Sequence, residues 1–150
     1  MSALLSVTSY TEDKKNIGIT IASMCNALNN NDVKTAAKNL LDNCLLIRPT
    51  GNPLSKKDWL NMLNSSDVTM KKSELMQINK LDINRDWAFV CYTLHEVFSY
   101  KGNDNDDVSV CSAVLKKVPN VRLGATDVWK FAYLQRSTGR SPDEPLPKFD

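Results

Sequence analysis

Four long extended runs fill the chain from about residue 70 onward, and this pattern limits the possible folds more than any other feature. Only short polar breaks separate the runs: Asn84–Asp86, Lys101–Asp107 and Pro119-Asn120. Long strands joined by short turns favour antiparallel pairing in a meander. The second run is apolar or bulky at both odd and even positions, so both of its faces should be covered. The four predicted strands are Glu74–Ile83, Trp87–Tyr100, Val108–Val118 and Ala125–Ser137.

The first part of the chain carries helical patterns instead. The spacing of the apolar residues in 12–29 predicts an α-helix, and Thr11 is placed to cap its N-terminus. Asp32 is placed to cap a second, shorter helix. Ser55, with Asp58 three residues on, predicts the start of a third. The residues expected to face inward are Ile17, Ile21, Met24, Cys25 and Leu28 in the first helix, Val33, Ala36, Ala37, Leu40 and Leu41 in the second, and Trp59, Leu60 and Leu63 in the third.

A short apolar segment lies between the second and third helices. Cys44–Ile47 ends at Arg48-Pro49, which predicts a strand closed by a turn at residues 50–53. Helices at the start and strands after them predict an α+β fold: about three N-terminal helices packed on a curved, mostly antiparallel sheet, forming a cone with a blind cavity. We expect a single domain over residues 1–150, with its core at about 12–140 and extended termini at 1–10 and 140–150.

Charge and cysteine content restrict the partners expected of this chain. Its 19 basic and 17 acidic side chains give a formal charge of +2, so neither nucleic acid nor a membrane is an expected partner. Four cysteines without a C-x-x-C pair and a single histidine predict no metal site. No cofactor-binding motif is found, so no cofactor is expected. Apolar surroundings suit free, buried thiols, which together with an N-terminus unlike a secretory signal predict a cytoplasmic or other reducing compartment.

Four segments resemble, in their order and spacing, the nuclear transport factor 2-like superfamily over roughly residues 12–140. They are Ala27–Asp32 after the first helix, Arg48–Gly51 before the helix with Trp59, Asp86–Tyr92 opening a long strand, and Trp129–Ser137 near the end. The nearest branches are the SnoaL-like domains and the association domain of calcium/calmodulin-dependent protein kinase II. The resemblance implies the cone fold but no single function, because this fold hosts isomerases, cyclases, dehydratases, binding modules and oligomerisation domains.

The resemblance also implies which residues face the cavity. The kinase association domain has a cluster of arginines there; the last corresponds to Arg136, whereas the other two correspond to Leu94 and Ala113. This departure weakens the transfer of an anion-binding cavity. Arg48 is a further polar candidate, and Trp59 is either core or a ligand contact. The expected cavity is mostly apolar, with Arg136 as its polar handle, and is lined by Ala88, Val90, Tyr92, Leu94, Ala113, Ala132 and Leu134.

Three residues are candidates for acid–base chemistry. His95 is the only histidine, but strand parity places it on the side opposite Tyr92 and Glu96, so it is either catalytic or an interface residue. Glu96 could act as a base in a desolvated cavity, with Tyr92 donating to a developing oxyanion. The alternative is that Glu96 and Arg136 pair with each other across neighbouring strands or end in solvent.

Trp129, Phe131 and Tyr133 occupy alternate positions of the last strand, so they are expected on one face of the sheet. A row of large rings must be covered. Members of the superfamily commonly cover this face with the sheet of a second subunit, so the resemblance implies a homodimer or higher oligomer, with His95 also at the interface. The alternative is that the rings form the core beneath the helices.

Two functions follow as hypotheses. The first is a homo-oligomeric SnoaL-like domain that serves as an assembly or small-molecule-binding module for a small apolar ligand. The second is a cofactor-free isomerase, cyclase or dehydratase, in which Tyr92 polarises a carbonyl and Glu96 or His95 moves the proton. An accessory subunit that docks through its proline-rich tail is a third possibility.

Overall fold

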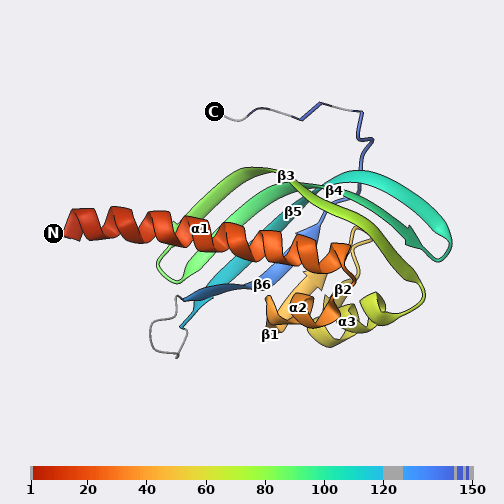
Figure 1. Ribbon diagram of the computed structural model, residues 1–150, viewed down its shortest axis with the longest axis horizontal. Helices are drawn as coiled ribbons and strands as arrows, with labels where there is room; N and C mark the ends of the chain where they lie inside the picture. Colours follow the sequence, from red (N-terminus) through yellow and green to blue (C-terminus); the bar gives the residue numbers. More distant parts are fainter. Residues whose placement is uncertain (1, 120–126, 144, 147, 149–150) are drawn as a thin grey trace.

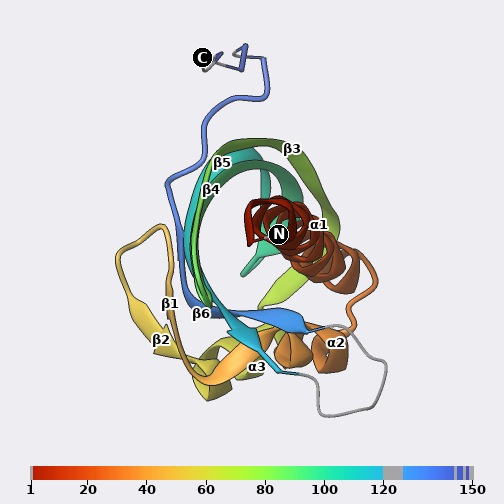
Figure 2. The same cartoon turned by 90° about the vertical axis from the view of Figure 1, so that its left-hand side faces the viewer.

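The computed structural model describes residues 2–119, 127–143, 145–146 and 148, with side chains from residue 9 onward. A six-stranded mixed sheet in the order β2-β1-β6-β5-β4-β3 curves around helix α1 (Figures 1 and 2). Neighbouring strands are antiparallel except β1 and β6, which are parallel. The elements are α1 Ser2–Asn29, α2 Val33–Lys38, β1 Leu40–Ile47, β2 Pro53–Ser55, α3 Lys56–Asn64, β3 Val68–Asn84, β4 Trp87–Tyr100, β5 Asn103–Val118 and β6 Val128–Arg136. The predicted α+β cone is confirmed.

Helix α1 is longer than the sequence pattern predicted. It spans Ser2–Asn29, so the expected extended segment 1–10 and the expected N-cap at Thr11 are wrong. The first glycine is Gly18 and the first proline is Pro49, so nothing before residue 12 interrupts a helix. Each added residue gains one backbone hydrogen bond once the helix has formed. The N-terminal part of α1 extends beyond the sheet in Figure 1. No helix in the described part of the chain is long and apolar enough to cross a membrane.

The two short helices begin at the predicted caps. The side chain of Asp32 accepts a hydrogen bond from the backbone N–H of Thr35 at 3.1 Å, and Ser55 Oγ accepts one from that of Asp58 at 3.1 Å. Helix α2 ends at Lys38, however, so placing Leu40 and Leu41 in this helix was wrong. The carbonyl of Asn39 accepts a hydrogen bond from Phe131 N–H, and β1 therefore starts directly against β6.

Strand β5 begins earlier than predicted. The polar residues 103–107 were expected to form part of a break, yet they pair with the end of β4 down to Tyr100 opposite Asn103. Lys101 and Gly102 have φ angles of 50° and 84°. Two consecutive positive φ values are typical of the tight two-residue turn whose twist matches that of antiparallel strands. The pairing imposed by this turn outweighs the low strand propensity of the Asn and Asp residues that follow it.

The core lies between α1 and the concave face of the sheet. Ile17 and Ile21 of α1 are fully buried there, and Thr20 Oγ1 donates a 2.8 Å hydrogen bond to the carbonyl of Trp129. Trp129 and Phe131 are 1% and 0% exposed within the single chain, so assigning these two residues to a subunit interface was wrong. They belong to the core together with Val90 of β4.

A β-bulge explains why the three rings of β6 do not share one face. Phe131 pairs with Leu115, whereas Tyr133 pairs with the preceding residue, Val114. Ala132 is therefore the extra residue, and an extra residue turns the following side chains to the other face. Tyr133 consequently lies on the convex side of the sheet, while Trp129 and Phe131 point toward α1.

Candidate functional site

A cavity of about 350 Å³ opens beside the C-terminal half of α1. Its wall comes from α1, the turn after β1, α3 and the ends of strands β3 to β6. Of the residues expected to bind a ligand, six line it: Arg48, Trp59, Tyr92, Leu94, Leu134 and Arg136. Ala113 does not line it, because this residue is fully buried at a paired position between Val90 and Leu134. Cys111, two residues earlier on β5, lines the cavity instead and was missed.

The floor of the cavity is apolar and electrically neutral. Met24, Leu46 and Leu94 supply aliphatic surface there. Burial raises the pKa of the Cys111 thiol and that of the Tyr92 hydroxyl well above their ordinary values. Burial likewise raises the pKa of the Cys25 thiol. These groups therefore stay uncharged at neutral pH, and a ligand that reaches the floor meets no formal charge.

Glu96 and Arg136 form an ion pair at one side of the cavity. Arg136 Nε lies 2.8 Å from Glu96 Oε1, and the side chains of these residues are 20% and 7% exposed, respectively. Ser73 Oγ donates a hydrogen bond of 3.2 Å to the other carboxylate oxygen of Glu96. Burial raises the pKa of Glu96, and the Arg136 charge opposes this shift. Glu96 and Arg136 therefore pair with each other, as one expectation from the sequence had it, but they do so across β5 rather than from neighbouring strands.

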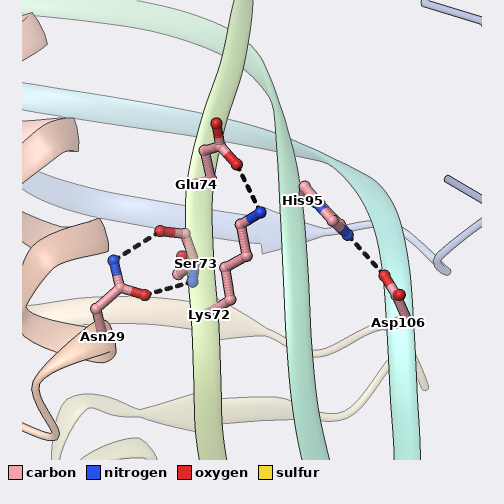
Figure 3. Close-up of polar contacts among 6 residues, drawn as sticks. All are labelled: Asn29, Lys72, Ser73, Glu74, His95 and Asp106. Atoms are coloured by element: carbon pink, nitrogen blue, oxygen red, sulfur yellow. Dashed lines mark hydrogen bonds and ion pairs between the residues drawn. The ribbon is translucent and has the colours of Figure 1, made fainter.

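The end of α1 holds Ser73 in place (Figure 3). Asn29 Nδ2 donates to the carbonyl of Ser73 at 2.9 Å, and Asn29 Oδ1 accepts from the Ser73 backbone N–H. Ser73 is 2% exposed, and it is paired with Glu96 in the β3–β4 ladder. This contact ties the helix to the carboxylate through one serine.

Two arginines lie over aromatic rings of β4. The Arg136 guanidinium is 5.2 Å from the centre of the Phe98 ring, and that of Arg48 is 5.6 Å from the centre of the Tyr100 ring. Arg48 Nη1 also lies 3.5 Å from Met62 Sδ on α3. Nε and Nη2 of Arg136 are buried and have no aligned hydrogen-bond acceptor among the described residues. The close contact of Nε with Glu96 is thus a charge contact with poor hydrogen-bond geometry.

His95 lies outside the cavity. Its Nε2 is 2.6 Å from Asp106 Oδ1, on the convex side of the sheet (Figure 3). The proposed proton-transfer role in the cavity is therefore open to Glu96 and Tyr92 but not to His95. The described part of the chain contains no group of three or more His, Cys, Asp or Glu side chains that could hold a metal ion.

The tail after β6 supplies two lining residues that the sequence pattern did not indicate, Thr138 and Gly139. Arg140 forms a bridge to Val108, which holds the tail along the edge of β5. A Cβ atom on Gly139 would lie 2.4 Å from the Asp107 Cβ, so only glycine lets the chain pass this close.

Comparisons with known proteins agree with this fold. A sequence model of the family described as protein of unknown function (DUF3804) matches residues 12–144. An NTF2-like protein of unknown function from Prochlorococcus marinus is 29% identical, with a TM-score of 0.72 over 85% of this chain and 94% of its own. No curated protein matches the chain in sequence.

Two more distant structures share the fold. A candidate Ca/calmodulin-dependent kinase II association domain from Exiguobacterium sibiricum is 11% identical, with a TM-score of 0.70 over 87% of this chain and 95% of its own. A ketosteroid isomerase-like protein from Erwinia carotovora is 21% identical, with a TM-score of 0.65 over 85% and 96%. The NTF2-like fold expected from the sequence is confirmed, and proteins with this fold have dissimilar functions.

Proposed function

Since this chain belongs to the DUF3804 family and has an NTF2-like fold, we propose that it is a homo-oligomeric module that binds a small, largely apolar molecule. The observation that carries the proposal is the cavity of about 350 Å³ with its neutral floor. Small-molecule sites have volumes of roughly 300–1,000 Å³ and are mostly apolar with a few placed polar groups. This cavity lies at the small end of that range, so it suits a ligand of about one ring and a short chain.

Binding of a neutral aromatic amide, 4-phenylbutanamide, tests this proposal by isothermal titration calorimetry. We expect the wild-type protein to bind it, and a Leu134→Trp variant to bind at least tenfold more weakly, because the indole fills the cavity. Val128→Trp is the matched control, since Val128 lies on the same strand, is exposed and does not line the cavity. Equal binding by wild type and Leu134→Trp, or a wild type that binds neither this amide nor the corresponding acid, contradicts the proposal.

The convex face of the sheet supports self-association. Leu45, Tyr133, Val114 and Phe89 are successive partners across β1, β6, β5 and β4, so they form one apolar row. Phe89 and Leu45 at its ends are 39% and 41% exposed. A contiguous apolar row on a surface typically marks an interaction site. We infer that a second copy of the chain covers this row, with Tyr133 retained from the interface residues predicted from the sequence.

Replacing Phe89 by serine should therefore weaken the dimer. We expect its dissociation constant to rise at least tenfold, about 1.4 kcal/mol, as measured by sedimentation equilibrium. Ile19→Ser is the control, because Ile19 is an exposed apolar residue on α1, away from the row. A wild-type protein that is monomeric at micromolar concentration would show that the row is not a subunit interface.

A cofactor-free isomerase, cyclase or dehydratase is the second candidate function. It is favoured by one observation: a desolvated carboxylate, Glu96, and a neutral hydroxyl, Tyr92, line the same cavity. Native mass spectrometry of the purified protein identifies a ligand that has co-purified. Adding this ligand back to the protein then separates the two candidates. A binding module returns the ligand chemically unchanged, whereas an enzyme returns a product of altered structure or with exchanged protons.

A further inference from the structure

Arg48 and Arg136 lie at the same end of two paired parallel strands. Ile47, the last residue of β1, is paired with Gln135 of β6, so Arg48 opens the turn that follows β1 and Arg136 is the last residue of β6. Leu46 and Leu134 one step earlier both line the cavity, and side chains alternate along a strand. Both arginines line the cavity as well, so the two side chains reach it from the same end of these paired strands.

The rings beneath the two guanidinium groups belong to one strand. Phe98 and Tyr100 are two residues apart on β4, so they lie on one face of the strand, about 7 Å from each other. Each guanidinium lies over its own ring, and both arginines line the same cavity. Stacking on an aromatic ring holds a guanidinium in place while leaving its N–H groups free to donate at the edge.

The charges of the two arginines are balanced differently. Arg136 contacts Glu96, yet Nη2 stays buried without an acceptor among the described residues. The contacts of Arg48 in the described structure are the Met62 sulfur, the Tyr100 ring and backbone bonds, with no carboxylate within ion-pair distance. Asp107 also lines the cavity, and it forms no ion pair with either arginine in the described part of the chain. The mouth thus has one cation without a direct counter-charge beside one orphaned N–H group.

We propose that Arg48 and Arg136 together bind the carboxylate of a small apolar acid, whose apolar body lies on the neutral floor of the cavity. The inference rests on the proposed binding function and adds the head group of the ligand. A planar carboxylate fits the paired N–H donors of a guanidinium, and its single charge balances Arg48. A dianionic phosphate fits less well, because Glu96 and Asp107 line the same mouth and would repel the second charge.

The test compares an acid with its uncharged amide: 4-phenylbutanoate and 4-phenylbutanamide, titrated into the full chain by calorimetry at neutral pH. We expect the wild type to bind the acid at least tenfold more tightly than the amide. In Arg48→Met this preference should fall to twofold or less, because the variant loses far more affinity for the acid than for the amide. Arg48→Lys should keep part of the preference, because it keeps the charge but loses the planar fork. Lys57→Met is the control, since it removes one exposed charge on α3 outside the cavity.

The outcomes separate the two proposals. Equal binding of acid and amide by the wild type, or an acid preference that survives in Arg48→Met, overturns the carboxylate inference and leaves the binding function standing. Failure of the wild type to bind either compound overturns the binding function, and the inference falls with it. Arg48 is the residue to replace because its side chain has no ion-pair partner among the described residues that the change would leave unpaired, so the variant should fold like the wild type.

Discussion

Replacing Arg136 by methionine is expected to lower the free energy of unfolding by about 3–5 kcal/mol, the usual cost of leaving one member of a buried ion pair without its partner. Glu96 is 5% exposed, and Ser73 is the only other side chain that donates to its carboxylate in the described structure. A methionine of similar length keeps most of the packing on Phe98, so the loss would come from the stranded carboxylate rather than from a hole.

Urea denaturation of three variants separates these causes. Glu96→Gln should cost less than Arg136→Met, because a neutral amide can still accept from Ser73. The double variant Glu96→Gln/Arg136→Met should recover most of the stability that Arg136→Met loses, because it removes both charges of this pair. If the double variant is as unstable as Arg136→Met, the stranded carboxylate is not the cause, and lost packing of the arginine stem is.

The loss of unfolding free energy in Arg136→Met should also depend on pH. The pKa of Glu96 is raised in the folded protein, so this residue favours the folded state at low pH, and that contribution is lost as the pH rises through the folded-state pKa. Without the Arg136 charge, which lowers this pKa, the shift becomes larger. The difference in unfolding free energy between wild type and Arg136→Met should therefore shrink as the pH falls from 7 toward the ordinary carboxyl range.

The parts of this fold that local rules determine were predictable from the sequence. Strand β4 has the predicted bounds, Trp87–Tyr100, because a polar break flanks each end of a run of bulky residues. The caps at Asp32 and Ser55 were predicted because one side chain and one nearby backbone N–H suffice to form them. The resemblance to the superfamily placed Tyr92, Leu94 and Glu96 on the cavity side of β4, and all three are buried.

The parts that depend on pairing between distant segments were not predictable. The bulge at Ala132 is visible only in the register of β6 against β5, and it sent two of three predicted interface rings into the core. Cys111 lines the cavity in place of Ala113 for a related reason. The local sequence of β5 does not indicate which of its paired positions borders the cavity. The contact of Arg48 with Tyr100 joins a turn to a strand end more than 50 residues away, so it too carries no local signal.

Phe131→Ala is the second variant with a large expected effect. Its ring is fully buried in the core beneath α1, so truncation should cost about 3–5 kcal/mol through lost burial and the cavity left behind. Tyr133→Ala, two residues on, should cost much less in the isolated chain, because its ring lies half-buried on the convex face and its hydroxyl donates to the exposed Gln135 side chain.

Protein concentration distinguishes these two losses. Loss of a residue that stabilises the folded chain itself lowers the unfolding free energy by the same amount at every protein concentration. Loss of a residue that stabilises a dimer acts through mass action, so its effect depends on concentration. The deficit in unfolding free energy of Phe131→Ala should therefore be constant between micromolar and hundredfold higher protein concentrations. The deficit of Tyr133→Ala should grow with protein concentration. If both deficits grew with concentration, β6 would lack the bulge and both rings would face the second copy. The concentration series thus tests the register of β6 and the covered convex face at once.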